Sequence, residues 1–148
     1  MNNSYIIEEA KEMGAEIYEA LKTLIPQLSS SGSIPSQAQL EEMISSPATH
    51  LLLAREQGTR RIVGSLTLII FRIPTGVRAW IEDVVVDSGS RGKGIGRMLC
   101  KAAIEEAKKA NAKTVDLTSR PTREEANRLY RSVGFELRDT NVYRFTIY

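Results

Sequence analysis

The sequence predicts an α/β protein whose mixed sheet carries helices on both faces. Strand-like segments follow one another from 50 to 86, with turns too short to hold a crossover helix, which predicts an antiparallel meander. After Asp87, helical patterns alternate with a short strand pattern, which predicts a βαβα half. The two halves together predict antiparallel and parallel strands in one sheet.

The N-terminal part of the chain is predicted to be helical. Over residues 9–24 apolar side chains recur at steps of three and four, the period of a helix with one buried face, and Pro26 is expected to stop this helix. Ser36 is expected to cap a second, short helix that ends before Pro47. The serine-rich stretch 29–33 is interpreted as a mobile loop within one domain.

The meander and the half that follows are predicted from β-branched content, turns and periodicity. The predicted strands are 50–55, 61–73, 77–86 and 114–118, the predicted helices are 94–110 and 123–133, and a terminal pair of strands is expected around 139–141. Thr122 and Glu125 have the spacing of a capping box at the start of the last helix. Gly134 is expected to end that helix.

Composition limits the classes of protein. The 148 residues favour a single domain over 1–148. The chain has 20 basic and 18 acidic residues, interspersed, so bulk nucleic-acid binding is not expected. One cysteine, Cys100, and one histidine exclude a disulfide framework and a His/Cys zinc site, and no metal is expected. The sequence shows no signal peptide or spanning stretch, so a cytoplasmic protein without a membrane partner is expected.

The most informative segment leads from an apolar strand into a helix through a basic, glycine-rich loop. The first turn of a helix has free backbone N–H groups and the positive end of the helix dipole. Glycines let the backbone approach a phosphate closely, and basic side chains add charge. The pattern therefore predicts a pyrophosphate site. The strand ends in Val84-Val85-Val86, and the loop is Arg91-Gly92-Lys93-Gly94-Ile95-Gly96.

Two other phosphate-binding motifs do not fit this loop. A Walker loop requires Ser or Thr after Gly-Lys, but Gly94 follows Lys93, and Asp87 stands where its first glycine should be. A dinucleotide-binding fingerprint that starts at Gly92 requires a glycine where Arg97 stands. The sequence thus excludes a P-loop NTPase and a Rossmann site at this loop.

With this loop the chain resembles the GCN5-related N-acetyltransferases (GNAT). Their acyl-CoA loop has the pattern Arg/Gln-x-x-Gly-x-Gly/Ala, and the segment from Arg91 to Gly96 matches it without a departure. The resemblance extends from about Trp80 to Phe135. It implies the GNAT-like acyl-CoA N-acyltransferase fold and an enzyme that transfers the acetyl group of acetyl-CoA to a primary amine by direct attack in a ternary complex. The alternative is a non-catalytic acyl-CoA-binding or sensor domain.

The resemblance also implies roles for individual residues. Asn127 corresponds to an Asn that contacts the cofactor, and Tyr130 to a Tyr that protonates the departing CoA sulfur. A phenol with a pKa of about 10 can give its proton to a thiolate whose conjugate acid has a pKa of about 8.5. The alternative for Tyr130 is a residue of the apolar helix face. The implied cofactor-binding residues are the backbone groups of Val84, Val85 and Val86 for the pantetheine arm, and Arg91, Gly92, Lys93, Gly94, Ile95 and Gly96 for the pyrophosphate.

Glu82 and Asp83 are the candidates for the base that takes the proton of the attacking amine. Neighbouring strand residues face opposite sides, so at most one would point into a given cleft unless a bulge intervenes. The strand 81–86 is similar to that of glucosamine-phosphate N-acetyltransferases, where acidic residues lie near the amine. Glu82 acting through water is the preferred base, and an edge or ion-pair role is its alternative. A backbone N–H near Val85 is expected to hold the oxyanion.

The remaining reactive and aromatic side chains receive weaker assignments. His50 is predicted to be structural or at the surface, and Cys100 a buried small hydrophobe. The aromatic residues Trp80, Phe71 and Tyr143 are predicted to be parts of the core, with the lining of a substrate pocket as the alternative. Ser119 and Arg120 follow a predicted parallel strand, where a cleft opens; Arg120 could meet a carboxylate or phosphate of the substrate or cofactor, and a surface salt bridge is its alternative.

The acetyl acceptor stays open from the sequence. A small amine, an amino sugar, a peptide N-terminus and a lysine side chain all fit. The segment 142–147 alternates well enough to pair with a partner chain, so a homodimer is a further expectation.

Overall fold

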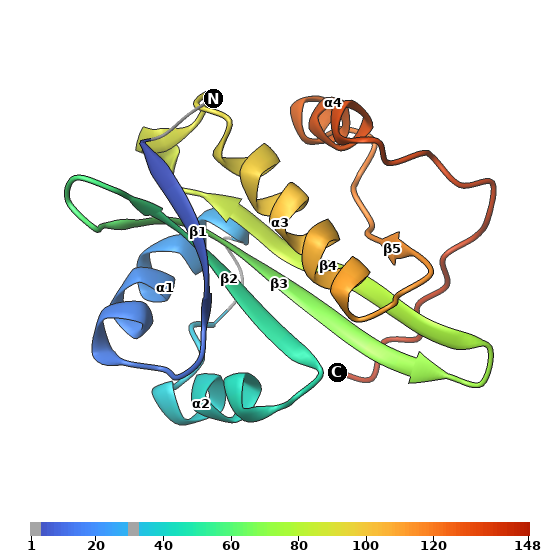
Figure 1. Ribbon diagram of the computed structural model, residues 1–148, viewed down its shortest axis with the longest axis horizontal. Coiled ribbons are helices and arrows are strands. Elements are labelled where there is room, and N and C mark those ends of the chain that lie inside the picture. Colours follow the sequence, from blue (N-terminus) through green and yellow to red (C-terminus); the bar gives the residue numbers. More distant parts are fainter. Residues whose placement is uncertain (1–3, 30–32) are drawn as a thin grey trace.

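The computed structural model describes residues 4–29 and 33–148, and it contains the predicted mixed sheet (Figure 1). The five strands lie in the order β1-β2-β3-β4-β5; the first four pair antiparallel, and β5 is parallel to β4. The elements are β1 (Tyr5–Ala10), α1 (Ala15–Leu28), α2 (Gln37–Ser45), β2 (Thr49–Glu56), β3 (Ile62–Ile73), β4 (Gly76–Val86), the 3-10 turn η1 (Ser88–Ser90), α3 (Ile95–Lys109), β5 (Val115–Asp116) and α4 (Glu124–Val133).

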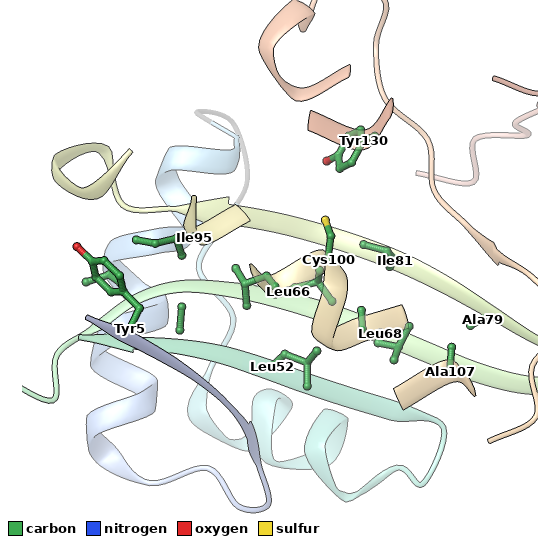
Figure 2. Close-up of a cluster of buried hydrophobic side chains, with 14 residues drawn as sticks. Tyr5, Leu52, Leu66, Leu68, Ala79, Ile81, Ile95, Cys100, Ala107 and Tyr130 are labelled. Atoms are coloured by element: carbon green, nitrogen blue, oxygen red, sulfur yellow. The ribbon is translucent and has the colours of Figure 1, made fainter. Parts of the chain in front are cut away.

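Helices cover both faces of the sheet, which confirms the predicted architecture. Strand β2 contributes side chains to two hydrophobic clusters, one on each face of the sheet. Leu52 and Ala54 belong to the cluster under α3 and α4, whereas Leu51 and Leu53 belong to the cluster under α1 and α2. Because successive side chains of a strand point to opposite faces, the uninterrupted apolar run buries both. Figure 2 shows part of the first cluster, in which Leu66, Leu68 and Ile81 of the sheet lie beside Cys100 and Ala107 of α3.

The N-terminal prediction was wrong in its boundaries. Glu9 and Ala10 end strand β1, and helix α1 begins only at Ala15. The pairing of β1 with β2 over Tyr5–Ala10 outweighs the local helical period, because the strand buries Tyr5 and Ala10 while alternate residues form ladder hydrogen bonds. Pro26 does not stop α1 but lies on an exposed side of its last turn, so only two further residues continue the helix beyond it.

The other helix signals gave mixed results. Ser36 caps α2 with the predicted hydroxyl contact, and Gln39 completes a capping box. Gly134 ends α4 in the left-handed conformation, as predicted. The capping box at Thr122 and Glu125 was wrong: Arg123 is the N-cap of α4, and no described side chain caps that helix. Residues 30–32 of the predicted loop 29–33 lie outside the described residues.

The C-terminal strands were also predicted wrongly. The strand expected at 114–118 shortens to Val115–Asp116, and the pair expected around 139–141 does not form within this chain. Tyr143 and Phe71, expected in the core, are 88% and 38% exposed. None of the described helices has the length and apolar character needed to span a membrane.

Candidate active site

The parallel strands β4 and β5 separate soon after they meet. Their ladder joins only Ala79 to Val115 and Trp80 to Asp116, while β4 continues to Val86. Beyond Trp80 no described strand pairs with this side of β4. The sheet therefore opens beside the last residues of β4, at the carboxyl ends of two parallel strands, where α/β proteins commonly bind ligands.

The backbone of β4 presents alternate residues to this opening. The Asp87 N–H donates to the Val63 carbonyl oxygen (2.8 Å), so Asp87 faces β3. Because an antiparallel strand alternates, Val85 also faces β3, whereas the backbone groups of Val84 and Val86 point to the open edge. The Val86 carbonyl accepts from Nε of Arg91 (3.2 Å), which agrees with this direction.

A β-bulge interrupts β4 at the candidate base residues. Thr67 pairs with Glu82 and Ser65 with Val85, so two residues of β4, Asp83 and Val84, stand opposite one residue of β3. Asp83 adopts a φ of +50°. Residues three apart on a regular strand face opposite sides, but Ile81 and Val84 both pack against the cluster under α3. The bulge therefore reverses the alternation of side chains between them. The sequence left such a bulge open; with it, Glu82 and Asp83 both become exposed.

The two carboxylates differ in their surroundings. Nε1 of Trp80 donates to the Glu82 carboxylate over 2.7 Å, which fixes that carboxylate beside the half-buried indole. Trp80 and Glu82 are two apart on one strand, so they share a face. Asp83 occupies the bulge itself. The orientation of Glu82 therefore depends on Trp80, a residue that the sequence analysis assigned to the core, with a pocket lining as the alternative.

The loop before α3 has the conformation that an anion site needs. Gly92 and Gly94 have φ of +78° and +80°, the left-handed region, and a Cβ at either would meet no atom within 4 Å. Gly94 is the N-cap of the 15-residue helix α3, no described side chain caps it, and its first turn has no acidic residue. The backbone N–H groups of this turn thus remain available beside open space. This donor set fits the pyrophosphate of an acyl-CoA.

The neighbours of the loop hold it in place. The Ile95 side chain is buried in the core, while Arg91 and Lys93 are exposed. A Cβ at Gly96 would lie 3.0 Å from Cδ2 of Leu129, so this glycine permits the close approach of α3 to α4.

A glutamine that the sequence did not single out ties α1 to the start of the loop. Nε2 of Gln27 donates to the Asp87 carboxylate (2.9 Å), and the Ser88 N–H donates to Oε1 of Gln27 (2.9 Å). Arg61 adds a contact of 3.4 Å to the other Asp87 oxygen. The hydrogen bond from Gln27 and the neighbouring Arg61 hold the pKa of Asp87 below its usual value. Residues so distant in sequence leave no local signal.

Tyr130 of α4 is almost fully buried. Its ring packs edge to face on Phe135, with centroids 6.0 Å apart, and Figure 2 shows the Cys100 sulfur directed toward the side on which Tyr130 lies. Burial raises the pKa of Tyr130; the Cys100 thiol adds to the rise, and Arg123 opposes it. The phenol is therefore protonated at neutral pH.

Two polar side chains flank the segment that joins β5 to α4: Ser119 follows β5, and Asn127 lies in the first turn of α4. Nδ2 of Asn127 donates to the Arg120 carbonyl (2.9 Å), so the amide holds this segment against the helix. The Ser119 hydroxyl oxygen is buried with no hydrogen-bond partner among the described residues. A buried polar atom without a hydrogen-bond partner costs folding free energy. This oxygen lies just after β5, the strand beside which the sheet opens.

The residues that were assigned structural roles agree with that assignment. His50 contacts the Glu9 carboxylate through Nδ1 (3.2 Å). Cys100 is fully buried, and burial raises its pKa to about 11. Across residues 4–29 and 33–148, no group of three His, Cys, Asp or Glu side chains is placed to hold a metal ion.

Comparisons with known proteins agree on one family. The Acetyltransferase (GNAT) family matches residues 15–135. The uncharacterized N-acetyltransferase YhdJ of Bacillus subtilis (strain 168) is 31% identical over 131 residues, which cover 86% of this chain and 88% of that protein. The glucosamine 6-phosphate N-acetyltransferase 1 of Oryza sativa subsp. japonica is 29% identical over 128 residues, which cover 82% and 76% of the two chains.

A solved structure shares the fold over almost the whole chain. An aminoglycoside acetyltransferase, meta-AAC0020, from an uncultured soil metagenomic sample has been solved in complex with sisomicin. It aligns with a TM-score of 0.86 at 21% identity, covering 99% of this chain and 97% of that chain.

Proposed function

The chain belongs to the GNAT acetyltransferase family, and we propose that it transfers the acetyl group of acetyl-CoA to a primary amine by direct attack in a ternary complex. The observation that carries this proposal is the open edge of β4 beyond Trp80, followed along the chain by the uncapped N-terminus of α3. The strand end offers backbone donors, and the helix end offers an anion site. We take residues 1–148 as one catalytic domain.

The cofactor-binding roles follow this arrangement. Acetyl-CoA, when bound, supplies an activated acetyl thioester. The backbone groups of Val84 and Val86 are the candidates to hold the pantetheine arm, since those of Val85 face β3. The first-turn N–H groups after Gly94, together with Arg91 and Lys93, are the candidates to hold the pyrophosphate. Asn127 stays the candidate for a contact to the cofactor, and its amide also donates to the Arg120 carbonyl, which holds the segment before α4.

The acid chemistry is assigned to Tyr130. Its phenol is neutral because burial raises its pKa, so it carries a proton that it can give to the departing CoA sulfur. The Val84 N–H, directed to the open edge, is the candidate donor to the developing oxyanion. The sequence placed this donor near Val85, whose own N–H is directed to β3.

The base is Glu82 or Asp83. The amine must lose a proton to attack, and both carboxylates are exposed at the bulge of β4. Glu82 is favoured because the hydrogen bond from Trp80 fixes one of its oxygens and leaves the other able to accept from a water. Asp83 remains the alternative.

We propose a small-molecule amine as the acceptor, with a peptide amine as the alternative. The rice relative is named for glucosamine 6-phosphate, and the metagenomic structure contains sisomicin, both of which carry amino groups on sugar rings. The exposed carboxylates at the bulge suit a cationic amine. We further propose a cytoplasmic location, in keeping with a single buried thiol and no disulfide.

Calorimetric titration with acetyl-CoA, with NADH and ATP as controls, tests the cofactor site. Selective binding of acetyl-CoA is expected. Gly94→Ala should weaken it about tenfold, because the loop with Ala relaxes out of the left-handed conformation in the free protein and binding must restore it at about 1–2 kcal/mol. Gly89→Ala is the matched control: Gly89 has ordinary φ, and a Cβ there meets only Asp87 at 3.6 Å. Equal losses in the two folded variants would contradict the assigned site.

An amine panel with detection of released thiol then tests turnover. Acetylation of an amino sugar or another small amine is the expected result. Acetyl-CoA binding without turnover on any amine would instead identify an acyl-CoA-binding or sensor domain. Failure of both binding and turnover in a folded protein would overturn the proposal.

A further inference from the structure

The loop that forms the anion site is joined to the sheet through a short turn, and contacts from other elements set the direction of this turn. The turn is η1, which directly precedes Arg91, the first residue of the glycine loop. Inside it, the Ser90 N–H donates to the Asp87 carbonyl oxygen (2.8 Å). One backbone bond closes a turn but does not direct it relative to other elements. The orientation of η1, and with it the start of the loop, therefore depends on contacts from elsewhere in the fold.

The side-chain amide of Gln27 on α1 makes two such contacts. Its Nε2 donates to Oδ1 of Asp87 (2.9 Å), and its Oε1 accepts from the Ser88 N–H (2.9 Å). The same Nε2 also donates to the Thr23 carbonyl oxygen (3.2 Å), which holds the side chain against its own helix. The donor and the acceptor of one amide are thus both used on two consecutive residues. A contact at two points fixes the direction of the turn as well as its distance from α1.

Helix α1 gives this contact a packed support. Leu24, three residues before Gln27, is 1% exposed in the cluster under α1 and α2, and Gln27 itself is half-buried. The other contact to the turn comes from Arg61 of β3, which reaches Asp87 over 3.4 Å and the Ser90 hydroxyl over 3.5 Å. These distances are longer, and the Arg61 side chain is exposed. Gln27 is therefore the shorter and better shielded of the two contacts.

We propose that Gln27 is a positioning residue for acetyl-CoA, which it does not touch: it holds η1 so that Arg91 and the free N–H groups after Gly94 meet the pyrophosphate together. This inference rests on the proposed acetyl-CoA site. Gly92 and Gly94 allow the loop many conformations, and a loop that becomes ordered only on binding costs affinity. A fixed start of the loop lowers that cost. Gln27 therefore acts on the affinity for the cofactor and not on the acetyl-transfer step.

Gln27→Met tests this role, because it removes both contacts to η1 and keeps an unbranched side chain of similar length. Calorimetric titration should give a Kd for acetyl-CoA about tenfold weaker than that of the wild type, a loss of about 1.4 kcal/mol. The KM for acetyl-CoA should rise by a similar factor with kcat nearly unchanged. Gln37→Met is the matched control and should bind as the wild type does. Gln37 contacts the Met13 carbonyl and the Glu41 carboxylate, each at 3.5 Å, and neither belongs to η1 or to the glycine loop.

The outcomes separate this inference from the proposed function. If the wild type binds acetyl-CoA and Gln27→Met binds it equally well, the positioning role is overturned and the proposed function stands. If the folded wild type does not bind acetyl-CoA, the proposed function fails and this inference fails with it. A fall in kcat at an unchanged Kd also overturns the positioning role, because Gln27 would then act on the transfer step.

Gln27→Glu gives a second readout, one that a simple loss of packing would not change. The new carboxylate can still accept from the Ser88 N–H, but it replaces the donor to Asp87 by a second negative charge. At about pH 8 the two carboxylates repel each other, so the variant should bind acetyl-CoA about tenfold more weakly than the wild type. At about pH 5 the pair shares a proton, and one O–H takes the place of the amide donor. The ratio of the two Kd values should then fall toward one.

The other charged groups around this contact are the same in both proteins. Arg61 of β3 contacts Asp87, and Glu16 and Glu19 of α1 line the same cleft. Comparing variant and wild type at each pH therefore removes the titration of these groups and of the cofactor phosphates. A ratio of Kd values that does not change between the two pH values overturns the positioning role, because the contact between position 27 and Asp87 would then not control binding.

Discussion

At the scale of single residues, burial decides the chemistry of the candidate acid. Burial raises the pKa of Tyr130 and has a larger effect on it than any neighbouring group. The phenol therefore keeps its proton over the whole neutral range, and in the proposed role its own ionisation should not limit activity below pH 10. A pH profile that falls on the acidic side would report instead on the base or on the amine.

Replacing Tyr130 by Phe tests its role as acid. We expect kcat to fall about a hundredfold or more, the usual contribution of a positioned proton donor, with the Kd for acetyl-CoA nearly unchanged. Tyr5→Phe is the matched control, because Tyr5 is equally buried but lies on β1. If Tyr130→Phe keeps full kcat, Tyr130 is a packing residue.

Cys100 gives a second prediction from burial, on stability. Its pKa is raised from the usual 9.0 to about 11, so the folded state disfavours the thiolate. Folded-state stability from this group is complete below pH 9 and is lost as pH rises toward 11, by up to about 3 kcal/mol.

Denaturant unfolding of the wild type and of Cys100→Ala across pH 8–11 measures this loss. The stability advantage of the wild type should shrink over that range, and at pH 8 the native thiol should not react with a disulfide reagent until the protein is unfolded. A constant advantage, or a thiol that reacts in the native state, would contradict the buried position.

At the scale of elements, local signals succeed where a side chain contacts its own turn. The Ser36 hydroxyl accepts from the Gln39 N–H at 3.2 Å, and Oε1 of Gln39 accepts from the Ser36 N–H at 2.9 Å. The bulge of β4 is the opposite case, because it exists only through the register between β3 and β4. The cap of α2 could thus be predicted from four consecutive residues, whereas the bulge of β4 could not.

Ser36→Ala should cost about 1 kcal/mol of unfolding free energy, since it removes the side-chain half of the cap of α2. Urea unfolding followed by circular dichroism measures this. Ser46→Ala is the control, because Ser46 closes the same helix with its backbone N–H alone and should change stability by less than about 0.5 kcal/mol. Equal costs at both positions would argue that the cap contributes nothing.

At the scale of the whole molecule, Arg55 of β2 fastens the N-terminal elements to the sheet. Its guanidinium binds the carboxylate of Glu8 on β1, both oxygens of Glu16 on α1 (2.7 and 3.0 Å) and the Arg60 carbonyl (2.7 Å). Hydrogen bonds that Arg55 donates to Glu16 and Glu8 raise its already high pKa, so the charge is permanent. One side chain thus joins two elements that the sequence alone did not connect.

Arg55→Met should lower the unfolding free energy by about 2 kcal/mol, or Tm by about 5 °C, because several charge-assisted bonds are lost while the exposed carboxylates rehydrate. Calorimetry measures the change. Arg60→Met is the control, since the exposed Arg60 only approaches Glu8 at 3.8 Å and such a pair is worth little. A smaller loss of stability for Arg55→Met than for Arg60→Met would contradict the role of Arg55 in holding β1 and α1 to the sheet.

The sequence by itself determined the features whose cause lies within a few consecutive residues. These are the meander with its short turns, the glycine loop from Arg91 to Gly96, the cap at Ser36 and the helix end at Gly134. Periodicity and φ preferences are local properties, so a sequence states them directly. Tyr130 was named in a different way, through the resemblance to the GNAT family, and Glu82 and Asp83 as carboxylates on an otherwise apolar strand; their roles are proposals.

The tertiary structure alone decided what depends on pairing between distant segments. It turned residues 5–10 into a strand, brought Gln27 to Asp87, placed Trp80 beside Glu82 and left 136–148 exposed and outside the sheet. Each of these outcomes depends on which backbone finds which ladder partner. That choice is settled by burial and hydrogen bonding across the whole sheet, and no local pattern contains it.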